Sequence, residues 1–183
     1  MSADRHVALL RGINVGRAKR VAMADLRALV EGLGYRDVRT LLNSGNVVFG
    51  APARARGDAA RRIEEALART LGVTARVQVV SADDVAAVVA GDPLAGAARD
   101  PSRYVVTFVS DPAALARVGP LAARDWSPDA VHLGSGVAYT WCERGLLQSD
   151  AMAAVAKALG DAGTSRNWAT VLKLHAMLGE PPA

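Results

Sequence analysis

The sequence predicts an α+β fold built from two similar halves. Three observations lead to this prediction. Along the 183 residues, the spacing of apolar side chains switches repeatedly between the period of a strand and the period of a helix. Two pairs of short apolar runs flank small turn residues, as the strands of hairpins do. A stretch containing glycine and proline, residues 91–102, separates the two halves.

The first half begins with an apolar run, residues 6–11, that is typical of a strand. Residues 23–33 have helical spacing, and Gly34 follows where a left-handed C-terminal cap uses glycine. Residues 38–43 and 46–49 are predicted hairpin strands joined by Ser44 and Gly45. Asp58 is predicted to cap a helix that runs to about residue 71, and residues 75–80 form the next strand.

The second half repeats this order loosely, without a sequence repeat. Ser81 and Asp84 resemble a capping box that begins a connecting helix reaching residue 90. The predicted elements that follow are a strand at 104–109, a helix beginning at Pro112, a hairpin at 130–133 and 137–141, and helices at 150–159 and 165–178.

The elements predicted for the first half, residues 6–80, have the β-α-β-β-α-β order of ferredoxin-like folds. We expect two tandem ferredoxin-like subdomains, 1–80 and 103–183, with a connecting helix and loop at 81–102 and a C-terminal helix closing the second.

Composition and charge narrow the function only a little. The formal charge of +4 could indicate an anionic partner such as nucleic acid. The basic residues of the chain are nearly all arginine, however. A high arginine content is typical of a GC-rich coding background whatever the function, so the charge alone is weak evidence for an anionic partner. No stretch approaches the ~18 apolar residues of a membrane span. Cys142 is the only cysteine, so no intrachain disulfide is possible and we expect a cytoplasmic protein.

Three polar clusters stand out: LRGINVG at residues 10–16, NSGN at 43–46, which leads into VVF, and TSRNWAT at 164–170, which leads into VLKL. With these motifs, in this order, the chain resembles domain-of-unknown-function family 1697, which is widespread in bacteria. The resemblance implies paired ferredoxin-like units and implies no reaction. Arg17, Lys19, Ala22 and residues 149–151 depart from the pattern that members usually show.

The first cluster follows a predicted strand that ends at Arg11. Gly12 and Gly16 would allow backbone N–H groups to turn toward an anion, with Arg11, Arg17, Lys19 and Arg20 adding charge. The spacing is neither that of a Walker loop nor that of a dinucleotide-binding loop. A tight loop in which Asn14 bonds its own backbone explains the same residues.

The other two clusters also allow two interpretations each. Asn43, Ser44 and Asn46 are ordinary turn residues, or polar groups on a rim shared with Arg11 if the strands lie in one sheet. In the predicted last helix, Arg166 and Lys173 lie on one stripe, ~10 Å apart, and Arg166, with Asn167 next to it, lies near the N-terminal end, where an anion is favoured. The alternative is a packed helix in which Trp168 is a core residue.

Few residues indicate catalysis. His6, His132 and His175 lack the spacing of metal ligands, Cys142 is expected to be structural, and we expect no metal and no cofactor. The favoured hypothesis is a binding module for a small anionic ligand, phosphorylated or nucleotide-like. An enzyme of unassigned reaction acting on such a ligand, and a nucleic-acid or protein-interaction domain, are the alternatives. The predicted ligand-binding residues are Arg11, Asn14, Asn43, Ser44, Asn46, Arg166, Asn167 and Lys173, with Trp168 fixing the last helix beneath them.

Overall fold

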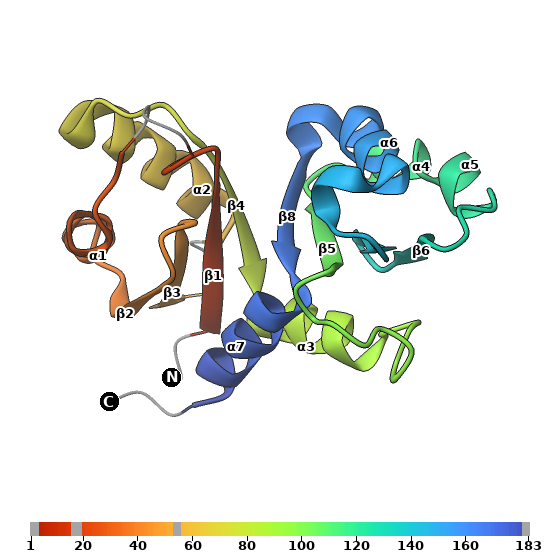
Figure 1. The fold of residues 1–183 in the computed structure, drawn as a ribbon. Helices are drawn as coiled ribbons and strands as arrows, with labels where there is room; N and C mark the ends of the chain where they lie inside the picture. The colour runs from red at the N-terminus through yellow and green to blue at the C-terminus, as the bar shows by residue number, and fades with distance from the viewer. Residues whose placement is uncertain (1–3, 16–19, 53–55, 181–183) are drawn as a thin grey trace. The chain divides into compact units, whose positions relative to one another are not determined.

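The structure is a computed structural model that describes residues 4–15, 20–52 and 56–180. It shows an α+β fold with two four-stranded antiparallel sheets (Figure 1). The chain divides into two compact units, Met1–Val85 with Leu174–Ala183, and Ala86–Lys173. The subdomain bounds expected from the sequence stay a prediction, because a cluster of contacts is not the same as an independently folding domain.

The first unit follows the order β-α-β-β-α-β, and its strands are arranged β2-β3-β1-β4. Its elements are β1 (Asp4–Arg11), α1 (Met23–Gly32), β2 (Arg36–Leu41), β3 (Asn46–Ala51), α2 (Arg56–Ala66), the π-helical turn Leu67–Leu71, β4 (Arg76–Ser81) and the start of α3 (Ala82–Ala90). Helices α1 and α2 bury Leu26, Val30 and Ile63 against Ala8 and Phe49 of the sheet.

The strands of the second unit are arranged β6-β7-β5-β8, and its three strand pairings are all antiparallel. Its elements are β5 (Tyr104–Val109), α4 (Pro112–Ala116), α5 (Gly119–Ala122), β6 (Ala130–Gly134), β7 (Val137–Trp141), two short 3₁₀ turns (Leu146–Gln148 and Gly160–Ala162), α6 (Asp150–Leu159), β8 (Gly163–Asn167) and α7 (Trp168–Gly179). Its core packs Ala114 of α4, Val118 between α4 and α5, and Val155 of α6 against Val131 and Ala138.

Several local signals are confirmed. Gly34 has a φ of +87°, as a left-handed residue after a helix requires. The Ser81 hydroxyl oxygen accepts from the Asp84 N–H at 3.1 Å, and the Asp84 carboxylate accepts from the Ser81 N–H at 3.4 Å and from its hydroxyl at 2.6 Å, which is a capping box with aspartate in place of glutamate. Asp111 caps α4 by accepting from the Ala113 N–H at 2.9 Å.

Three expectations were wrong. Residues 163–167 form strand β8 rather than the start of the last helix, which begins at Trp168. The hairpin turn spans four residues, 42–45, because Leu42 and Gly45 both adopt positive φ and β2 ends at Leu41. Asp58 lies within α2 rather than before it, and its carboxylate accepts from Arg61 at 3.0 Å.

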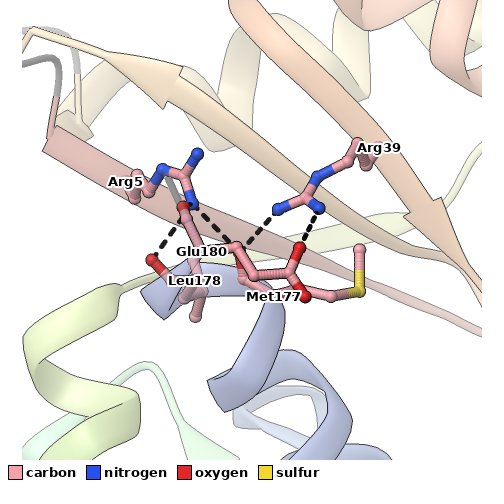
Figure 2. Close-up of polar contacts among 5 residues, drawn as sticks. All are labelled: Arg5, Arg39, Met177, Leu178 and Glu180. Carbon is pink, nitrogen blue, oxygen red and sulfur yellow. Dashed lines mark hydrogen bonds and ion pairs between the residues drawn. The ribbon is translucent and has the colours of Figure 1, made fainter. Parts of the chain in front are cut away.

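The end of α7 lies against the first sheet, within the first unit, where two arginines hold it (Figure 2). Arg5 donates to the carbonyl oxygens of Met177 at 3.0 Å and Leu178 at 3.2 Å, and also to that of Glu180. Arg39 donates to the Met177 carbonyl at 2.6 Å and pairs with the Glu180 carboxylate at 2.5 Å. Cations at a helix C-terminus satisfy the last carbonyls and oppose the negative end of the helix dipole.

Candidate functional site

The polar loops of the first unit meet at one end of its sheet. Strand β1 ends at Arg11, and Leu9 lies opposite Asn46, the first residue of β3. The loop after β1 and the turn between β2 and β3 therefore emerge side by side, as expected from the sequence. We call residues 11–15, residues 42–46 and Arg76 together the loop rim.

Asn14 joins the two loops of the loop rim. Its side-chain amide donates to the carbonyl oxygens of Asn43 at 2.8 Å and Val21 at 2.9 Å, and its oxygen accepts from the Val21 N–H at 2.9 Å. The residue has a φ of +55°, a conformation that asparagine tolerates better than most residues. The whole amide is engaged in this way, so Asn14 holds the loop after β1 against the turn between β2 and β3.

Asn46 has a similar scaffolding position. It is fully buried, and its amide donates to the Leu41 carbonyl at 2.7 Å and to the Ser44 hydroxyl at 3.0 Å. Gly45, the last residue of the turn, has a φ of +84°, and its carbonyl accepts from the Leu10 N–H at 2.8 Å. Of the polar residues in the turn, Asn43 and Ser44 are the exposed ones.

Two arginines lie opposite each other on the loop rim. Arg11, the last residue of β1, is paired in register with Arg76, the first residue of β4. Side chains directly opposite in an antiparallel pair have Cβ atoms about 5 Å apart, and like charges there are destabilising. The sequence analysis missed Arg76. Its place beside Arg11 depends on the register of β4 with β1, which no local sequence pattern shows.

The glycine-rich loop is only partly described. Gly12 has a φ of +72° and is exposed, so this point of the backbone can approach a ligand closely. Gly16, Arg17 and Lys19, which were also expected to contribute, lie outside the described residues. Arg20 is exposed.

Arg166 lies in strand β8, not at a helix N-terminus as expected. It is 9% exposed and stands opposite Val106 of β5. Its guanidinium donates to the carbonyl of Ser165 at 2.8 Å, and burial lowers its pKa to about 10. The expected stripe of Arg166 and Lys173 on one helix face is therefore wrong, because only Lys173 is helical.

Asn167 and Lys173 differ in whether their side chains are available to contact a ligand. The side-chain oxygen of Asn167 accepts from the Thr170 N–H at 2.9 Å, so Asn167 caps α7. Lys173 is exposed on the same helix. Trp168 packs on the rings of Tyr104 and Tyr139, with centroids 5.1 and 6.5 Å away, and so anchors the start of α7 as expected. These residues belong to the second unit, and their convergence with the loop rim stays a prediction.

Other reactive groups are confined. Cys142 is fully buried, and its pKa is raised mainly by that burial, which keeps the thiol protonated and unreactive. Within residues 4–15, 20–52 and 56–180, no three histidine, cysteine or acidic side chains gather closely enough to hold a metal ion. In the same part of the chain, no helix is both long and apolar enough to cross a membrane.

Comparisons with known proteins agree with the motifs. The sequence model of a family described as a protein of unknown function (DUF1697) matches residues 3–139. The chain belongs to this family. The fold is similar to that of the conserved bacterial protein SP0830 from Streptococcus pneumoniae, with a TM-score of 0.74 and 22% identity over 97% of this chain and 99% of that one. No curated protein matches this DUF1697 member.

Proposed function

We propose that this DUF1697 protein is a binding module for a small anionic ligand, phosphorylated or nucleotide-like, that binds at the loop rim. The observation that carries the proposal is the register of Arg11 with Arg76. Two cations opposite each other in a ladder disfavour the sheet by a few tenths of a kcal/mol to ~1 kcal/mol. An anion at this end of the sheet would lie near both guanidinium groups and could accept forked, charge-assisted hydrogen bonds from them.

The loops beside the arginines support this assignment. Asn43 and Ser44 are exposed and carry amide and hydroxyl groups. The contacts of Asn14 and Asn46 fix the backbone that presents them, so less ordering is needed when a ligand binds. The roles predicted for the two asparagines thus become supporting ones in this proposal, while Arg11 and Ser44 keep theirs.

A nucleotide-like ligand is favoured by two apolar side chains on the same rim. Val15 is 73% exposed and Leu42 is 50% exposed. Leu42 also has a φ of +58°, which is an uncommon conformation for a bulky residue. β2 lies two strands from β1, so Leu42 is about 10 Å from Arg11 across the sheet. A ligand with an anionic end and a ring could contact both.

The alternatives use the same surface. An enzyme acting on such a ligand would bind its substrate here and stabilise developing charge with the two arginines. A protein- or nucleic-acid-interaction domain would place Val15 and Leu42 against its partner. We further propose that both units are ferredoxin-like subdomains, which the strand arrangements β2-β3-β1-β4 and β6-β7-β5-β8 support, and that the protein acts in the cytoplasm, in keeping with its one cysteine.

Calorimetric titration tests the proposal with phosphate, pyrophosphate, nucleotides, phosphorylated sugars and a short oligonucleotide. We expect Arg11→Gln and Arg76→Gln each to weaken binding about tenfold or more, since each removes charged hydrogen bonds. Arg36→Gln is the matched control. Arg36 is an exposed arginine of the same sheet, but it lies opposite Gly50, at the other end of the strands.

The outcomes separate the hypotheses. Binding of a nucleotide supports the module if the Arg36→Gln variant retains this binding and the Arg11→Gln variant loses it. Turnover of the bound nucleotide would identify an enzyme. Tight, salt-sensitive binding of the oligonucleotide alone would favour a nucleic-acid domain. Failure of every anion to bind would overturn the proposal. Lys173→Gln, made in parallel, tests whether the second unit contributes to the same affinity.

A further inference from the structure

A separate pocket of about 370 Å³ lies within the second unit, between two loops. Its volume is at the lower end of the range for small-molecule sites. The lining is polar, with contributions from the segment after α5, the loop after β7 and the first turn of α6. The pocket is lined by Arg124, Asp125, Trp126, Ser127, Pro128, Asp129, Arg144, Gln148, Asp150 and Ala151.

Asp129 holds the two sides of this pocket together. One of its carboxylate oxygens accepts from the Glu143 N–H at 2.9 Å, and the other accepts from the Ser149 hydroxyl at 2.6 Å. The Ser149 oxygen in turn accepts from the Met152 N–H at 3.0 Å and caps α6. The loops that form the pocket are therefore fixed without any ligand, as a preorganised site requires.

One wall is the indole of Trp126. Its N–H donates to the Leu121 carbonyl at 2.7 Å, so the ring orientation is set. The Arg124 guanidinium lies over this ring, 4.2 Å from its centroid. Arg124 is thereby held in place beside the pocket by a contact that leaves its hydrogen-bond donors available.

The charges of the pocket fall into two groups. The carboxylates of Asp125 and Asp129 are engaged by backbone N–H and hydroxyl groups of neighbouring residues. By contrast, Arg144 and Asp150 are exposed and form no ion pair with any residue that the structure describes. Arg144 and Asp150, which carry opposite charges, thus line one cavity without forming an ion pair with each other.

Several exposed arginines elsewhere on the surface pair with carboxylates three or four residues away, as in Arg27–Glu31, Arg61–Glu65 and Arg103–Asp100, whereas Arg144 and Asp150 do not pair with any described residue. Unpaired charges of both signs in the lining of one cavity match a ligand that carries both signs. The carboxylates in the lining outnumber the arginines, so a purely anionic ligand would meet repulsion there.

We propose that this pocket binds a zwitterion of the free α-amino-acid type. Its carboxylate would be held by the Arg144 guanidinium, with Arg124 beside it, and its ammonium group by Asp150. The side chain of the ligand would pack along Trp126 and Pro128. The site is independent of the loop rim, because it is formed within the second unit alone.

Nuclear magnetic resonance of the tryptophan side chains tests the proposal. The protein has three tryptophans, and Trp126→Phe identifies the indole signal of the one in the pocket. Common L-amino acids are titrated to about 10 mM, which detects millimolar dissociation constants. We expect at least one to shift the Trp126 signal in a saturable way, and Arg144→Gln and Asp150→Asn each to weaken its binding about tenfold or more.

Ligand derivatives assign each contact. The N-acetyl derivative lacks the ammonium group, so it should bind weakly and with equal affinity to the wild type and Asp150→Asn. The carboxamide lacks the carboxylate, so it should not distinguish the wild type from Arg144→Gln. Arg117→Gln is the matched control, because Arg117 is exposed in the same unit and does not line the pocket.

The proposal is overturned if no amino acid shifts the Trp126 signal, or if the N-acetyl derivative binds as tightly as the free amino acid. Equal loss in Arg117→Gln and Arg144→Gln would also overturn it, by showing a non-specific charge effect. Anion binding at the loop rim is measured separately with Arg11→Gln, so failure at one site leaves the other result intact.

Discussion

The side-chain amide of Asn14 donates to the carbonyl oxygen of Asn43, 2.8 Å away, across 29 residues of sequence. The same nitrogen donates to Val21. One side chain therefore fixes the geometry of both loops of the rim and the chain leading to α1. Its replacement should affect stability and ligand binding together.

Asn14→Asp tests this link. The change replaces two donors with an oxygen that faces the carbonyls of Val21 and Asn43, so we expect a loss of about 2–3 kcal/mol in the free energy of unfolding. Asn14→Gly keeps the positive φ and removes the bonds without repulsion, so its loss should be smaller. Urea denaturation measures both. Equal stability of the wild type and Asn14→Asp would show that the amide does not hold the loops.

The close packing beneath the turn makes a second prediction. A Cβ on Gly45 would lie 2.7 Å from the Ile13 Cδ1 atom and 2.8 Å from the Leu10 Cβ atom. Gly45→Ala should therefore cost about 2–4 kcal/mol, from strained φ and overpacking together. Gly72→Ala is the control, since Gly72 also has positive φ but nothing within 4 Å, and it should cost about 1 kcal/mol. Equal losses in the two variants would contradict the packing argument.

The arginines at the end of α7 make a third prediction. Glu180→Gln removes only an exposed ion pair with Arg39, so the cost should be below about 1 kcal/mol. Arg39→Met also removes the bond to the Met177 carbonyl and should cost about 1–2 kcal/mol. Hydrogen exchange should show faster exchange in the last turn of α7 in Arg39→Met alone. Similar exchange in both variants would assign the effect to the ion pair.

A fourth prediction concerns the pH dependence of folding stability, through the Tyr104 hydroxyl. Burial, and then its hydrogen bond to Asp92 at 2.7 Å, raise the pKa of the Tyr104 hydroxyl well above its ordinary value of about 10. Above pH ~10 the unfolded chain releases this proton while the folded protein retains it, so stability falls as pH rises. Tyr104→Phe should lose about 1 kcal/mol at neutral pH and show a shallower decline above pH ~10, measured by urea denaturation. An unchanged alkaline slope would contradict this assignment.

The sequence predicted most elements because their apolar residues keep a clear period. Strand β8 was the exception, since its residues 163–167 are glycine, threonine, serine, arginine and asparagine. Its buried positions are Thr164 and Arg166, and Gly163 leaves room for Leu159 and Thr107. A polar edge strand of this kind has no apolar alternation, so tertiary contacts decide its conformation.

The candidate site was predictable only in part. Polar composition located the loops that contain Asn14, Asn43 and Ser44. Which amides are engaged depends on strand register, because Leu9 must lie opposite Asn46 before Asn14 can reach Asn43. Register also brings Arg76 beside Arg11, and no local pattern contains that information.

The bond from Arg5 to the Met177 carbonyl joins residues 172 positions apart. During synthesis, β1 leaves the ribosome long before its partner exists. At typical translation rates of about 5–20 residues per second, the wait is roughly 9–34 s. Through this interval the guanidinium groups of Arg5 and Arg39 have no helix end to hold. The first sheet of a nascent chain therefore lacks its contacts with the end of α7 until residue 177 has been translated, and a product truncated before that residue would leave both arginines without these partners.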